Sequence, residues 1–108
     1  MRKGRHSVPG AYYSLTFSTL NRNPILANSK VANIIFESFD WLEDEKRIVW
    51  LCLMVMPDHV HAVFQLGNTH SLSSVIKSFK NFSAKQINIC LDRSGSLWQA
   101  AYYDHGIR

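Results

Sequence analysis

The sequence lacks the features that mark membrane-bound or secreted proteins. Its longest apolar run extends from Ile48 to Met56, far short of the roughly 20 residues that a membrane-spanning helix needs. The start of the chain, residues 1–6, is basic but has no apolar segment behind it, so it is not a secretory signal. We therefore predict no membrane partner and a cytoplasmic location.

Cysteine is scarce as well. The two cysteines, Cys52 and Cys90, lie far apart in apolar surroundings and neither belongs to a CxxC pair. A chain of 108 residues should not need a disulfide for stability. Because free cysteine is commonly buried, we predict both to be reduced core residues.

Internal repeats, low-complexity tracts and linkers are also absent, and the length suits a single domain over residues 1–108. The net charge is +4, a mild excess that is compatible with a polyanionic partner but does not establish one. Two basic groups stand out: an N-terminal arm over residues 1–9, with Arg2, Lys3 and Arg5, and a later segment with Lys77, Lys80 and Lys85.

The first half of the chain predicts a strand, a helix and a second strand. Residues 12–18 alternate between apolar and polar side chains, with Ser14, Thr16 and Ser18 on the polar face. Residues 31–46 have helical spacing of apolar positions. The nearly continuous apolar run over 48–56 predicts a central strand covered on both faces.

The second half predicts the same elements in another order. Residues 59–66 alternate again, residues 72–90 carry one apolar helical stripe, and residues 97–107 read as a fourth extended segment. The order βαββαβ predicts an α+β, ferredoxin-like fold. We expect a four-stranded antiparallel sheet with two helices on one face and the other face free for ligands.

The residues that point to chemistry are His59 and His61. Side chains two apart on a strand share one face, so both imidazoles are within reach of a single divalent ion. A His-x-His pair on its own is more often an ordinary pair of strand residues. Its place directly after Pro57-Asp58, at the start of a strand, favours metal binding.

The segment Met56-Pro57-Asp58-His59-Val60-His61 resembles the HUH motif of single-tyrosine transposases. More specifically, the chain is similar to REP-associated tyrosine transposases of the IS200-like superfamily, and the similarity covers nearly every residue after the basic arm. The other matching segments, in order along the chain, are residues 12–17, Asn21-Arg22, Ser78-Phe79-Lys80, Leu97-Trp98-Gln99 and residues 103–108.

The resemblance implies a metal-dependent reaction on DNA. In that family the two motif histidines help to hold Mg²⁺ or Mn²⁺ at the scissile phosphate of single-stranded or hairpin DNA. A tyrosine attacks and forms a 5′-phosphotyrosine. The family includes dimers, so a homodimer is compatible with the resemblance.

The catalytic residue is not assigned within this sequence. The family's tyrosine lies on a helix after the fourth strand, and the sequence stops at Arg108, so we expect that tyrosine beyond Arg108. Tyr102 and Tyr103 are better explained as packing or base-stacking residues than as nucleophiles. Asp58 either orients a histidine by a hydrogen bond or caps the turn after Pro57.

For DNA binding the sequence offers basic and aromatic candidates. They are Arg2, Lys3, Arg5, Lys77, Lys80 and Lys85 for phosphates, and Trp98 for stacking on unpaired bases. A lysine-rich helix face is equally well explained by solubility. Two alternatives to a transposase remain: a non-catalytic module that binds DNA hairpins, and an RNA-binding domain with the same element order.

Overall fold

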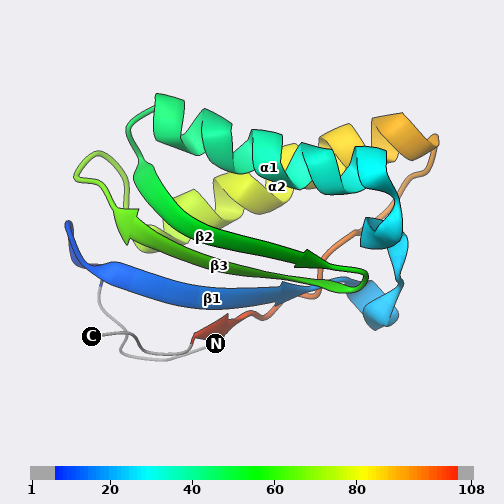
Figure 1. Ribbon diagram of the computed structural model, residues 1–108, viewed down its shortest axis with the longest axis horizontal. Coiled ribbons are helices and arrows are strands. Elements are labelled where there is room, and N and C mark those ends of the chain that lie inside the picture. The colour runs from blue at the N-terminus through cyan, green and yellow to red at the C-terminus, as the bar shows by residue number, and fades with distance from the viewer. Residues whose placement is uncertain (1–6, 105–108) are drawn as a thin grey trace.

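Two helices and a set of antiparallel strands make up residues 7–104, the part of the chain that this computed structural model describes. In chain order the elements are β1 (Tyr12–Ser18), the 3₁₀ turns η1 (Leu20–Arg22) and η2 (Ile25–Ala27), α1 (Ser29–Asp44), β2 (Ile48–Met56), β3 (His59–Leu66), α2 (Leu72–Leu91) and β4 (Tyr103–Asp104). The sheet order is β2-β3-β1-β4. Both helices lie on the same side of the strands (Figure 1).

Alternation along the strands decides which sheet face meets the helices. In β3 every second residue is buried, namely Val60, Ala62, Phe64 and Leu66. These side chains join one core with the apolar stripes of both helices, where the Phe39 and Phe79 rings meet edge to face at 4.8 Å. The intervening residues of β3, His59 and His61 among them, therefore point to the outer face, away from the helices.

The prediction of a four-stranded sheet was wrong. β1, β2 and β3 form a three-stranded antiparallel sheet, and among the described residues the segment predicted as a fourth strand over 97–107 meets it only at an isolated bridge of Trp98 with Thr19 and in the two-residue pairing of β4 with β1. Lys80 explains why the pairing is interrupted between these two points. Its Nζ donates to the carbonyl oxygens of Gln99 at 2.9 Å and of Ala100 at 3.1 Å. These carbonyls bond a side chain instead of a neighbouring strand, and residues 105–107 lie outside the described part. The α+β class is confirmed.

The prediction that β2 is a central, doubly covered strand was also wrong. β2 lies at the edge of the sheet and pairs with β3 alone among the described strands. Its outer face leaves large apolar side chains exposed, namely Val49, Leu51, Met54 and Met56. A run of apolar residues predicts a strand but does not show which of its faces will be covered. Among residues 7–104, no element covers the outer face of β2.

Cys52 and Cys90 are both exposed, which corrects their prediction as core residues. Cys52 belongs to the outer face of β2, and Cys90 lies in the last turn of α2 on the side away from the core. Both are free thiols, as predicted. None of the helices within residues 7–104 has the length and apolar character needed to cross a membrane.

Candidate functional site

The outer face of the sheet carries both motif histidines. The strand register places Thr16 of β1 and Met54 of β2 on either side of His61, and Ser18 and Met56 on either side of His59. Directly opposite residues in antiparallel strands share a face. Hydroxyls from β1 and thioethers from β2 therefore flank the two imidazoles.

His59 is oriented by the residue that precedes it. Its Nδ1 lies 2.9 Å from Oδ1 of Asp58, and Nε of Arg22 donates to Oδ2 of the same carboxylate at 3.0 Å. The pKa of the Asp58 carboxyl is lowered, first by the hydrogen bond from His59 and then by the one from Arg22. An ionised carboxylate only accepts hydrogen bonds, so Nδ1 of His59 carries a proton, and in the neutral ring the lone pair is on Nε2.

Arg22 reaches Asp58 because the loop after β1 is tied to the turn before β3. Thr19 donates its backbone N–H to the Asp58 carbonyl at 3.0 Å, and Leu26 donates to the Pro57 carbonyl at 2.9 Å. Asn21 and Arg22 both have positive φ, 58° and 54°, a conformation uncommon for residues other than glycine. This turn directs the guanidinium toward the carboxylate.

His61 is held by the neighbouring strand. Thr16 Oγ1 lies 3.0 Å from Nδ1 of His61, and Ser14 Oγ lies 3.2 Å from Nε2. Both ring nitrogens of His61 are thus engaged by hydroxyl groups of β1.

The donor set suits part of a divalent-metal site. Two residues along a strand advance the chain by roughly 6.6 Å, a span that two imidazoles on one face can bridge to a common ion. Within residues 7–104 no group of three or more His, Cys, Asp or Glu side chains could hold a metal. His59 and His61 would therefore supply two of the ligands and leave other positions to further donors.

Comparison with known proteins identifies the family. The family model described as "Transposase IS200 like" matches residues 7–106. The chain belongs to this family. The resemblance predicted from the sequence is confirmed, and the chain is placed among transposases, proteins of DNA transposition and recombination. A comparison with curated proteins found no match.

Two solved structures share the fold of this IS200-like chain. A proposed transposase from Deinococcus radiodurans R1 is 24% identical with a TM-score of 0.76, over 100% of this chain and 87% of that one. A REP-associated tyrosine transposase, solved bound to a REP hairpin, is 18% identical with a TM-score of 0.74, over 100% of this chain and 62% of that one. This chain therefore spans less than two thirds of the second protein.

The lysines predicted to bind DNA in this IS200-like chain lie away from the histidines. Lys77, Lys80 and Lys85 belong to α2, in the helical layer on the opposite side of the sheet. Lys77 and Lys85 are exposed, whereas Lys80 is half-buried, and burial lowers the pKa of its ammonium group. The basic arm residues Arg2, Lys3 and Arg5 lie outside the described residues.

Trp98 is not placed to stack on bases. Its side chain is only 7% exposed, it packs against Phe17 and Phe79, and its Nε1 donates to Ser83 Oγ at 3.0 Å. The indole therefore belongs to the core of the IS200-like fold. Sequence reasoning could not separate the two roles, because tryptophan serves in cores and on stacking surfaces alike.

Three side chains around the histidines were not predicted as site residues from the sequence: Ser14, Thr16 and Arg22. The polar face of residues 12–18 was a usable signal, since it marks the side of β1 that faces away from the core. For Arg22 the sequence offered only its place in a segment that matches the family, with no indication of a role. Its contact with Asp58 joins residues 36 positions apart, which no local pattern reveals.

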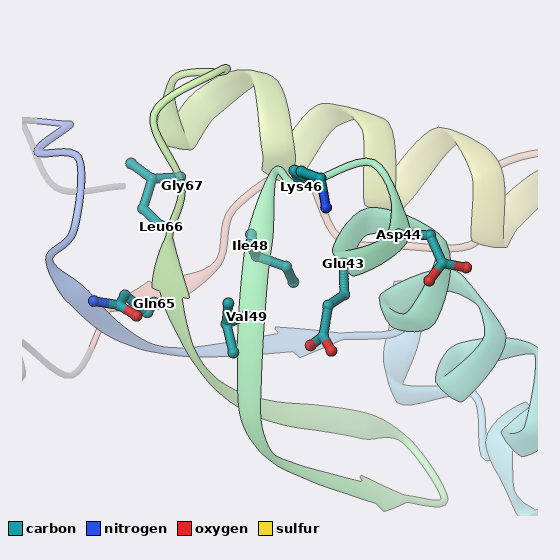
Figure 2. Close-up of a pocket in the computed structure, with 8 residues that line it drawn as sticks. All are labelled: Glu43, Asp44, Lys46, Ile48, Val49, Gln65, Leu66 and Gly67. Carbon is teal, nitrogen blue, oxygen red and sulfur yellow. The ribbon is translucent and has the colours of Figure 1, made fainter.

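A pocket of about 490 Å³ lies elsewhere on the IS200-like fold. Figure 2 shows its lining at the end of α1, the start of β2 and the end of β3, with Glu43, Asp44 and Lys46 at its rim. His59 and His61 are at the opposite ends of these strands. Its acidic side chains do not suit a nucleic acid, so the histidine face remains the candidate site.

Proposed function

We propose that this IS200-like chain binds a divalent ion, Mg²⁺ or Mn²⁺, through Nε2 of His59 and His61 and presents single-stranded hairpin DNA to it. The observation that carries the proposal is the shared outer face of the two histidines, each held by a neighbouring polar side chain. When bound, such an ion supplies Lewis-acid and template chemistry at a scissile phosphate. Asp58 orients His59, and the Thr16 hydroxyl at Nδ1 orients His61.

The DNA partner is supported by the family and by one neighbour in fold. That neighbour, the REP-associated tyrosine transposase, was solved with a REP hairpin. The exposed outer face of β2, with Met54 and Met56 beside the histidines, suits contact with unpaired bases. Exposed cations on α2 and the predicted basic arm would add affinity that does not depend on sequence. A DNA partner also favours the cytoplasmic location predicted from the sequence.

We assign metal and DNA binding to the described residues, and not the nucleophile. Tyr13 is buried, and its hydroxyl accepts the backbone N–H of Val8 at 2.9 Å. The ring of Tyr102 lies 6.0 Å from that of Phe17, in packing contact with the core. Strand cleavage through a phosphotyrosine therefore requires a tyrosine other than these two.

Metal binding is tested by titrating the 108-residue chain with Mn²⁺ by calorimetry. We expect the double variant His59→Ala, His61→Ala to lose binding, while His70→Ala, in the loop before α2, retains it. Equal Mn²⁺ affinity in all three proteins would reject the site. Binding of hairpin RNA that ignores the double substitution would favour the RNA-binding alternative instead.

DNA recognition is tested with a hairpin and a scrambled single strand of equal length and composition. Tighter binding of the hairpin supports the proposal, and equal affinity rejects hairpin recognition. Incubation of the hairpin with Mn²⁺ should give no covalent adduct through Tyr102 or Tyr103, which are predicted to pack or to stack on bases. An adduct that disappears in Tyr102→Phe or Tyr103→Phe would show that the assignment of the nucleophile is wrong.

A further inference from the structure

The two ring nitrogens of His61 are engaged by hydroxyls with opposite consequences for metal binding. A neutral imidazole has one N–H and one lone pair, so one hydroxyl must accept a hydrogen bond and the other must donate one. Thr16 Oγ1 faces Nδ1 at 3.0 Å, and Ser14 Oγ faces Nε2 at 3.2 Å. Which hydroxyl accepts decides which nitrogen is free of its proton.

His59 indicates the arrangement that a shared ion requires. Its Nδ1 is protonated against the Asp58 carboxylate, so Nε2 is the atom that would bind the proposed ion. His61 has the same tautomer, with its proton on Nδ1, when Thr16 accepts that proton. The Ser14 hydroxyl then donates to Nε2, the same lone pair that a metal ion would take.

We infer that Thr16 is a positioning residue that keeps His61 ready for metal, and that Ser14 competes with the metal for Nε2. This inference rests on the proposed metal site. Ser14 is nearly buried, at 4% exposed, so its hydroxyl has little access to water when an ion displaces it from Nε2. Binding of an ion at Nε2 would therefore break the hydrogen bond between Ser14 and His61 and keep the one between Thr16 and His61.

Substitutions of Ser14 and Thr16 should change the Mn²⁺ affinity in opposite directions, whereas a general loss of structure would weaken binding in both variants. Ser14→Ala removes the competitor and should tighten Mn²⁺ binding by about 2–10-fold, the effect of one neutral hydrogen bond. Thr16→Val removes the acceptor that fixes the ring and should weaken binding by about 10-fold. Thr16→Ser, which keeps a hydroxyl, should restore it. Ser18→Ala, on the same face beside His59, is the matched control and should change little.

The second measurement is the tautomer of His61 in the metal-free protein, by ¹⁵N NMR above the ordinary histidine pKa of about 6.5. We expect an Nδ1–H ring in the native chain and in Ser14→Ala, and a shift toward Nε2–H in Thr16→Val. Weaker Mn²⁺ binding in Ser14→Ala, or an Nε2–H ring in the native chain, would overturn the inference.

Failure of this inference is distinguishable from failure of the proposed function. If His59→Ala, His61→Ala abolishes Mn²⁺ binding but Ser14→Ala does not tighten it, the metal site stands and the competition is rejected. If the double variant binds Mn²⁺ like the native chain, the proposed function is rejected, and with it the competition for the metal. Thermal unfolding of each variant, compared with the native chain, confirms that the fold is retained.

Discussion

Arg22 donates from Nε to Oδ2 of Asp58 at 3.0 Å, while the other oxygen of that carboxylate faces Nδ1 of His59. One carboxylate thus joins a cation on the loop after β1 to an imidazole at the start of β3. The contact ties the orientation of a candidate metal ligand to a loop that is distant in the sequence.

Removal of this carboxylate should weaken metal binding. We expect Asp58→Ala to lower Mn²⁺ affinity by about 10–100-fold, the usual effect of losing a partner that orients a metal-bound histidine. Arg22→Gln should have a smaller effect in the same direction, because Arg22 acts through Asp58. Calorimetry measures both, with Lys30→Gln at an exposed position as the control. An Asp58→Ala variant that binds Mn²⁺ as tightly as the native chain would show that Asp58 does not orient His59 for metal binding.

The Asp58 carboxyl should titrate below its ordinary value. Its hydrogen bonds from His59 and Arg22 lower its pKa in the folded chain, so its contribution to stability is present above the unfolded value of about 3.9. That contribution is lost as the pH falls through the lowered folded value. Carboxyl ¹³C shifts in metal-free protein measure the midpoint, which should move upward in Arg22→Gln. A native midpoint at or above 3.9 would refute the assignment.

The buried bond between Trp98 and Ser83 should support the fold. Both side chains are buried, and the indole N–H donates to the hydroxyl at 3.0 Å. Ser83→Ala leaves that donor unpaired and should lower the free energy of unfolding by about 1–3 kcal/mol. Urea denaturation measures the change, with the exposed Asn81→Ala as control. In a Trp98→Phe background, which has no indole N–H, Ser83→Ala should cost less; an equal cost would show that this bond is not the cause.

Gly67 should tolerate no side chain. A Cβ at this position would lie 2.6 Å from the Lys46 carbonyl oxygen and 2.9 Å from that of Arg47. These atoms are backbone and Gly67 bonds the second of them at 2.8 Å, so they cannot move aside freely. We expect Gly67→Ala to lower the free energy of unfolding by about 1–3 kcal/mol. The neighbouring, exposed Asn68→Ala should change it by less than about 0.5 kcal/mol, and a similar small loss in both would contradict the clash.

Local sequence patterns predicted the helices and strands of this chain well, but they did not predict which elements pack beside one another. The alternation of β1 and β3 and the helical stripes identified the faces that form the core. The same reasoning failed for β2 and its Cys52, because an apolar strand looks alike at the centre and at the edge of a sheet. It failed again after α2, where the Lys80 ammonium takes carbonyls that a full fourth strand would have used.

The sequence by itself determined the α+β class, the family, and the shared face of His59 and His61, because the two-residue period of a strand is a local property. The tertiary structure alone decided which groups surround those histidines. Strand register brings Ser14 and Thr16 to His61, and a loop tied to the Pro57-Asp58 turn brings Arg22 to the Asp58 carboxylate that orients His59. Such contacts join residues far apart in the chain, so they follow from packing and not from sequence spacing.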